Sequence, residues 1–231
     1  MSPSPPAPTW TATEILERAW RLARDNFPAF ITVALVFQAA ALVVGLLSLG
    51  LLAGLVQLLG SVATAICLTW GTFQAVAGRK PGWDALVRRA QAPLFGRLLL
   101  LGCVQYLAIA VSAILVLPPF FLAPLWAVTI PAMMVERLDL GAAFWRSADL
   151  TAGRRLRVLG TFLLWFGLFV VGAAAITLVL GTGGLGQFVL TVYGAAAGIV
   201  LHPIPALLYL QLRAEKEGVS AGQIARAVAQ D

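Results

Sequence analysis

The single histidine is the first residue whose type and position could support chemistry. His202 lies in an uncharged apolar run, eleven residues before Arg213 and therefore about 16 Å from that charge along a helix. Ionisable residues at such depth in a membrane are rare, and they often mark a substrate or proton path. With its polar neighbours in sequence it defines a candidate intramembrane polar site, which comprises His202, Tyr209 and Gln211.

The same segment also has a structural interpretation. Helical spacing places on one face Gly194, Gly198, His202, Pro205 and Tyr209. Gly194 and Gly198 form a GxxxG pair, which permits close helix packing in a membrane. His202 is then expected to face the bundle interior as a neutral ring, bonded to a carbonyl that Pro203 or Pro205 leaves free. The structural histidine and the transport site both remain open interpretations.

A second set of polar residues lies in the segment 136–157, which holds eight charged residues between two long uncharged runs. Such a polar island is typical of an aqueous loop between membrane-spanning hairpins. Its arginines could bind lipid phosphates or a partner at the cytoplasmic leaflet. Alternatively, the loop is only solvated and basic. An interfacial ion-pair network could include Glu136, Arg137, Arg146 and Arg154. The candidate cytoplasmic lipid or partner site comprises Glu136, Arg146, Ser147, Arg154 and Arg213.

We expect no enzymatic activity, no metal and no cofactor. Metal-assisted phosphodiester hydrolysis needs clustered carboxylates, whereas the acidic residues here flank the apolar runs. A Ser–His–Asp arrangement cannot be assigned with one histidine at mid-membrane. The GTGGLG segment at 181–186 lacks the lysine of a phosphate-binding loop. Cys67 and Cys103 lie in apolar runs and are expected to be small buried hydrophobes.

Composition places these residues in a membrane protein. Hydrophobic residues make up 60% of the 231-residue chain and charged residues only 11%, against about 25% charged residues in soluble domains. The net charge of +6 fits cytoplasmic loops that collect Lys and Arg and meet anionic lipid headgroups. Nucleic-acid binding is not expected, because base recognition needs an exposed basic face on a soluble fold.

Three runs without Lys, Arg, Asp or Glu divide the chain, at residues 26–78, 98–135 and 158–212. One span needs about 20 residues, so each run suits two spans. The predicted fold class is an all-α membrane protein with six transmembrane helices in three hairpins. All 16 Lys and Arg residues then lie on one side, which the positive-inside rule makes cytoplasmic, together with both termini. The spans are expected near residues 30–49, 58–76, 98–116, 120–135, 156–180 and 188–212.

Details of two spans follow from their residues. Pro131 is expected to kink the fourth span. The apolar stretch 50–60 could extend either of the first two helices or form a shallow interfacial piece.

Cytoplasmic amphipathic helices are predicted before each hairpin. The first follows Thr11, which with Glu14 fits a capping box. The other two are expected at residues 83–90 and 141–150. The resulting division is a disordered tail at 1–10, a six-span membrane domain at 11–218, and a short cytoplasmic C-terminal helix at 219–231 that Ser220 and Gln223 could cap.

Residues 135–160, VERLDLGAAFWRSADLTAGRRLRVLG, resemble the signature of the bacterial family named for the membrane domain of glycerophosphoryl diester phosphodiesterase. In that family an acidic residue closes the fourth span, an Ala–Leu–Arg–Ser-like helix follows, and a Thr–x–Gly–Arg turn leads into the fifth. The similar positions here are Glu136, Ala143, Arg146, Ser147, Leu150, Thr151, Gly153 and Arg154. The segment LLYLQLRAEKEG at 207–218 also resembles the family, although members often carry Asp where this chain has Gln211.

The resemblance implies a six-span membrane domain in an envelope or lipid context. It does not imply phosphodiesterase activity, because hydrolysis in fused members belongs to a separate soluble barrel domain. The predicted function is a non-enzymatic protein of the bacterial inner membrane, a scaffold or accessory component in an envelope or lipid-related process. The alternatives are a transporter or lipid translocator with a site near His202, and a non-catalytic membrane partner domain of a phosphodiesterase. Expected partners are anionic lipid headgroups at the cytoplasmic face, and a membrane protein or a second copy of the chain.

Overall fold

The computed structural model describes residues 10–46, 51–82, 93–113 and 118–230, and this part of the chain is helical without a strand. The fold is therefore all-α, as predicted. The helices are α1 (Ala12–Asp25), α2 (Phe27–Leu46), α3 (Leu51–Val76), α5 (Pro93–Ala113), α6 (Pro118–Leu125), α7 (Thr129–Glu136), α8 (Leu140–Thr151), α9 (Arg155–Leu180), α10 (Gly184–Leu201), α11 (Pro203–Glu217) and α12 (Ala221–Gln230).

Within these ranges, four helical segments are long and apolar enough to cross a membrane. They are Gly54–Val76 in α3, Leu94–Ser112 in α5, Arg155–Leu180, and Gly184–Glu217, which joins α10 to α11. Shorter apolar stretches occur at Phe27–Phe37 and Phe120–Glu136. The chain thus has the helices of a membrane protein.

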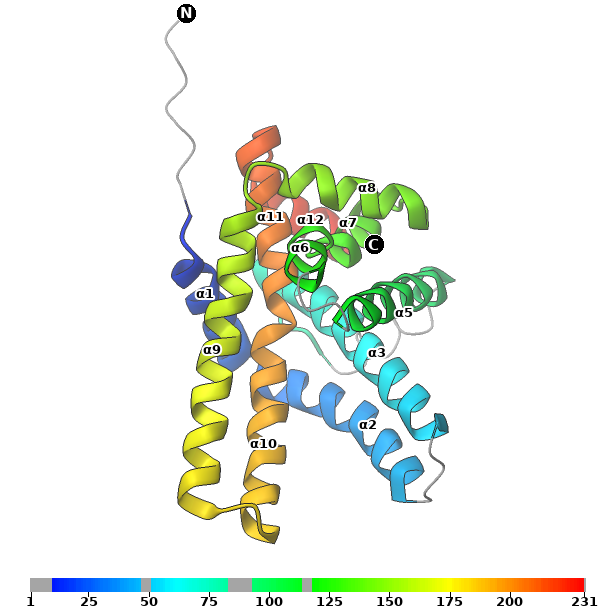
Figure 1. Ribbon diagram of the computed structural model, residues 1–231. Helices are drawn as coiled ribbons and strands as arrows, with labels where there is room; N and C mark the ends of the chain where they lie inside the picture. The colour runs from blue at the N-terminus through cyan, green and yellow to red at the C-terminus, as the bar shows by residue number, and fades with distance from the viewer. Residues whose placement is uncertain (1–9, 47–50, 83–92, 114–117, 231) are drawn as a thin grey trace, which may run out of the picture.

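The α9–α10 hairpin extends away from the rest of the molecule, and α8 lies across the opposite end beside α11 (Figure 1). Large apolar side chains cover this hairpin on the outside, and Leu178 and Val179 are 86% and 80% exposed. Water would solvate such a surface poorly. A lipid environment solvates it well, because helices satisfy their own backbone hydrogen bonds.

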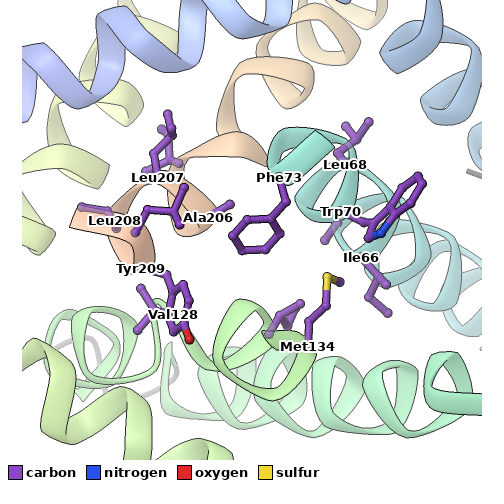
Figure 2. Packing of buried hydrophobic residues seen from close by; sticks show 14 of the residues in the cluster. Ile66, Leu68, Trp70, Phe73, Val128, Met134, Ala206, Leu207, Leu208 and Tyr209 are labelled. Carbon is purple, nitrogen blue, oxygen red and sulfur yellow. The ribbon is translucent and has the colours of Figure 1, made fainter. Parts of the chain in front are cut away.

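A core of buried apolar side chains joins α3, α7 and α11 (Figure 2). Phe73 of α3 meets the Tyr209 ring of α11 edge to face, with ring centroids 6.3 Å apart. Both side chains are fully buried, and Met134 of α7 also belongs to this core. Because Tyr209 carries a hydroxyl, the core borders a polar region at the end of α11.

Helix α1 lies against the bundle as an amphipathic helix. Thr11 and Glu14 form the predicted capping box, and Ile15, Ala19 and Ala23 are buried against the bundle. The opposite face is polar, and it also exposes Trp20.

The predicted fourth span is broken rather than kinked at Pro131. Helix α6 ends at Leu125, and α7 begins only at Thr129. Pro131 is therefore in the first turn of α7, where its missing N–H costs no intrahelical bond. A kink would require Pro131 to lie inside a continuous helix. Here α7 begins two residues before Pro131, so the chain breaks ahead of the proline instead.

Further predictions from the sequence concern α3, α8, α12 and the segment 83–90. Helix α3 starts at Leu51, so much of the ambiguous stretch 50–60 extends the second predicted span. Helix α8 confirms the helix predicted at 141–150, and Asp139 caps it by accepting a hydrogen bond from the Ala142 N–H at 2.7 Å. Helix α12 follows Ser220, whose Oγ accepts from the Gln223 N–H. The interfacial helix predicted at 83–90 lies outside the described residues.

Candidate functional site

Five polar side chains from α7, α8 and α11 meet at one end of the bundle, and we call them the polar layer: Glu136, Arg146, Tyr209, Arg213 and Glu217. The Arg146 Nε atom donates to both Glu136 oxygens, at 3.0 and 2.8 Å. Its other guanidinium nitrogens reach Glu217 and Asp149. Arg213 donates to Glu217 at 2.7 Å, and the Tyr209 hydroxyl donates to Glu136 at 2.8 Å.

The helices explain why these side chains converge. Tyr209, Arg213 and Glu217 follow i, i+4, i+8 spacing, so α11 presents all three on one face. Glu136 is the last residue of α7, and Arg137 turns the chain there in the left-handed region at φ 53°. Helix α8 then crosses back and brings Arg146 over Glu136.

The polar layer is electrically balanced, with two carboxylates against two guanidiniums. The four charged side chains are between 19% and 26% exposed. Burial alone would lower the pKa of Arg146, but hydrogen bonds and charge interactions with Glu217 and Glu136 raise it above its ordinary value. Because each charge already has an opposite partner, the arrangement is suited to holding three helices together.

A second ionic cluster surrounds Glu215. The Arg154 Nε and Nη2 atoms donate to one oxygen of Glu215 at 2.8 and 2.6 Å, and this carboxylate raises the pKa of Arg154. The Trp10 indole N–H donates to the other oxygen at 3.2 Å. Trp10 is 4% exposed, which corrects its assignment to a disordered tail at 1–10. The indole is held because its N–H satisfies an oxygen of the Glu215 carboxylate.

Ser147 lies apart from both ionic clusters. Its hydroxyl donates to the Leu125 carbonyl at 2.9 Å and accepts from the Val128 N–H at 3.2 Å. Those two backbone groups flank the break between α6 and α7. Ser147 is fully buried and so binds the backbone at the break rather than a ligand.

The predicted intramembrane residues His202, Tyr209 and Gln211 do not form one site, because each has its contacts in a different part of the structure. Tyr209 belongs to the polar layer, and Gln211 accepts from Arg18 of α1 at 3.5 Å. His202, at the junction of α10 and α11, lines a cavity of about 330 Å³. The cavity also receives Thr69, Gln105 and Tyr106. No hydrogen bond from the His202 ring to a carbonyl is present within the described residues.

The structure corrects the prediction that Gly194 and Gly198 of α10 pack closely against another helix. A methyl group added at Gly194 or Gly198 would meet no atom within 4 Å. Close helix approaches lie elsewhere, since Gly102 of α5 faces the Val62 side chain and Gly172 of α9 faces the Tyr193 ring. The GxxxG spacing alone could not decide which side of α10 meets a neighbour.

A basic cavity of about 370 Å³ lies between α1, α11 and the start of α12. Arg18, Arg21 and Gln211 supply its polar lining together with Asp25. Asp25 pairs with Arg24 at 3.3 Å. Within the described part of the chain, neither Arg18 nor Arg21 forms an ion pair, whereas Arg146, Arg154 and Arg213 all do.

Four contributors were missed from the sequence: Glu215, Glu217, Trp10 and Gln105. The sequence did hold a signal for Glu215 and Glu217, because buried arginines need carboxylate partners. Glu215 and Glu217 are two residues apart and thus about 200° apart around a helix, which lets one helix serve two clusters. No pattern pointed to Trp10 or Gln105, since both depend on distant segments.

The comparisons add no relative, because no family model, curated protein or solved structure matches the chain. Among the described residues, no group of three or more His, Cys, Asp or Glu side chains could hold a metal ion. Cys67 is buried and Cys103 half-buried, and both are free.

Proposed function

We propose that this chain is a non-enzymatic, six-span protein of the bacterial inner membrane that binds anionic lipid headgroups at its cytoplasmic face. In this role it is a scaffold or accessory component of an envelope or lipid-related process. One observation carries the proposal: Arg18 and Arg21 of the amphipathic α1 line a cavity without an ion-pair partner among the described residues. A lipid phosphate supplies the charge that these guanidiniums lack.

The position of the cavity supports a lipid rather than a soluble anion. Helix α1 leads directly into α2 through Asn26 and exposes Trp20 on its surface. Amphipathic helices with an aromatic residue and basic side chains lie in the interface, where headgroups are concentrated. The apolar part of the cavity lining, Leu22, Leu207 and Leu210, suits the glycerol and upper acyl region of a lipid.

The test is lipid retention by the full chain. Native mass spectrometry of protein extracted from membranes that contain phosphatidylglycerol and phosphatidylethanolamine would measure the preference for the anionic lipid. Replacing Arg18 and Arg21 together with Gln is expected to reduce this preference roughly thirtyfold, because each of the two surface charges contributes about 1 kcal/mol. The matched control replaces Arg97 of α5 and Arg155 of α9 with Gln, because both are exposed and neither helix contributes a residue to the described cavity lining.

Equal loss of preference in the control and the α1 variant would mean that only net charge matters. An unchanged preference in the α1 variant would contradict the headgroup site. Inorganic phosphate added as a competitor separates the two sources of phosphate, since a site built for lipid keeps its lipid at millimolar phosphate.

A transporter or lipid translocator is the second candidate, favoured by the cavity at His202. In proteoliposomes, such a protein would accelerate the exchange of a fluorescent lipid between leaflets. His202→Gln would then abolish the acceleration without lowering the thermal stability. An inactive wild-type protein in this assay would remove the candidate.

A further inference from the structure

The cavity around His202 collects polar groups that the fold does not pair. The Gln105 side-chain amide donates through Nε2 to the Trp126 carbonyl at 2.9 Å, which fixes the orientation of the amide. Its Oε1 atom is buried and has no donor. Thr69, Tyr106 and His202 also line the cavity, and within the described ranges none of their side chains has a hydrogen-bond partner.

An unpaired polar atom in a buried place is costly. The buried Gln105 Oε1 atom, with three further unpaired polar side chains in the same wall, therefore calls for an occupant. The remainder of the wall is apolar and aromatic, with Phe162, Trp165 and Phe166 supplied by α9. No charged residue contributes to the described wall. A charged occupant would therefore lose its hydration without compensation, whereas a neutral one with a single polar group fits.

The open side of the cavity indicates where an occupant would enter. Tyr106 of α5 and Phe166 of α9 lie at its edge and are 37% and 55% exposed. The neighbouring outer positions, Leu107 and Leu163, are exposed apolar side chains on the same two helices. Both helices are among the candidate membrane spans, so the opening faces hydrocarbon and not water.

We propose that this cavity binds an uncharged, largely apolar alcohol taken from the hydrocarbon phase of the membrane. Its hydroxyl donates to Gln105 Oε1 and accepts from the Thr69 hydroxyl or the His202 ring. The hydrocarbon part lies against the aromatic side chains of α9. The volume of about 330 Å³ is at the lower end of small-molecule sites, which span roughly 300–1,000 Å³, and it suits one chain or ring system. This site is independent of the anionic headgroup site at α1.

A pair of photoactivatable probes tests the proposal. One is dodecanol with a diazirine in its chain, and the other is the matching dodecane, which lacks only the hydroxyl. With the full chain in lipid nanodiscs, peptide mass spectrometry would map the labelled residues after illumination. The alcohol is expected to label the cavity-lining parts of α5 and α9 about tenfold more than the alkane, because a buried acceptor left unpaired is costly.

Variants separate the cavity from the general lipid surface. Gln105→Leu and Thr69→Val are each expected to reduce the preference for the alcohol several-fold while leaving alkane labelling unchanged. Gln187→Leu is the control, since Gln187 is exposed on α10 and distant from the cavity in sequence. Equal labelling by alcohol and alkane in the wild-type chain would overturn the proposal and leave water as the occupant. A retained preference in both cavity variants would also overturn it.

Discussion

At the residue scale, Tyr209 and Glu136 connect the apolar core to the polar layer. The Tyr209 ring packs against Phe73, while its hydroxyl donates to Glu136. Glu136 also accepts from Arg146 and lies 3.9 Å from Arg213. One carboxylate thereby holds groups from two other helices, which makes it the most consequential charge of the described network.

Glu136→Gln is expected to destabilise the protein by about 2 kcal/mol. The value lies below the 3–5 kcal/mol of a fully buried broken pair, because the layer is partly exposed and solvent screens it. The matched control is Asp149→Asn, whose carboxylate is 70% exposed and 3.5 Å from Arg146. Thermal unfolding in detergent would compare the two variants. Equal melting temperatures would show that Glu136 is only a solvated charge.

Gly102→Ala tests a close helix approach. A methyl group there would collide with the Val62 side chain, which is fully buried and stiff because it branches at Cβ. We expect a loss of about 1–3 kcal/mol. Gly96→Ala on the same helix meets nothing within 4 Å and should be neutral or stabilising by up to about 1 kcal/mol. A stable Gly102→Ala variant would place α5 farther from α3 than the structure does.

At the element scale, the break between α6 and α7 depends on a side chain from α8. The Ser147 hydroxyl satisfies one backbone acceptor and one backbone donor at the break. The Leu125 carbonyl and the Val128 N–H lie between the two helices, so the Ser147 hydroxyl stabilises the break at this place.

Ser147→Ala should therefore cost about 2–3 kcal/mol, since it leaves two buried backbone groups unpaired. Thr191→Val is the comparison, because its hydroxyl donates to the Gln187 carbonyl on an exposed helical face. Denaturation monitored by circular dichroism would measure both variants. A Ser147 variant as stable as the Thr191 variant would mean that water or another group satisfies the break.

At the scale of the whole molecule, α8 and α11 lie at one end and the α9–α10 turn lies at the other (Figure 1). The polar layer and the Glu215 cluster join α7, α8 and α11 at that end. This arrangement agrees with the expectation that segments 136–157 and 213–217 share one side of a membrane.

Cysteine labelling tests that sidedness. In a background without Cys67 and Cys103, Asp149→Cys and Thr182→Cys introduce thiols at exposed positions at opposite ends. A membrane-impermeant maleimide applied to spheroplasts is expected to label position 182 and spare position 149, with the reverse in inside-out vesicles. Labelling of both positions from the same side would contradict the predicted topology.

The sequence by itself determined the class of protein and most helices. Charge-free apolar runs and caps are local properties, so they predicted the start of α1 and both ends of α8 and α9 within one or two residues. The polar segment 136–157 was also visible as a candidate site, because buried charges are rare in an apolar chain. The six-span count and the side of the membrane remain predictions.

Only the tertiary structure decided which polar groups meet. Glu136 lies 73 residues from Tyr209 in sequence, and Arg146 lies 71 residues from Glu217, so no local spacing could join them. The same holds for Gln105 and His202, which share a cavity although they come from α5 and the α10–α11 junction. Apolar helices pack against one another through the shapes of their side chains, which the apolar pattern of the sequence does not specify. The rotation of each helix about its axis therefore depends on packing across the bundle, and this rotation decided that Gly194 and Gly198 face open space while Gly102 meets Val62.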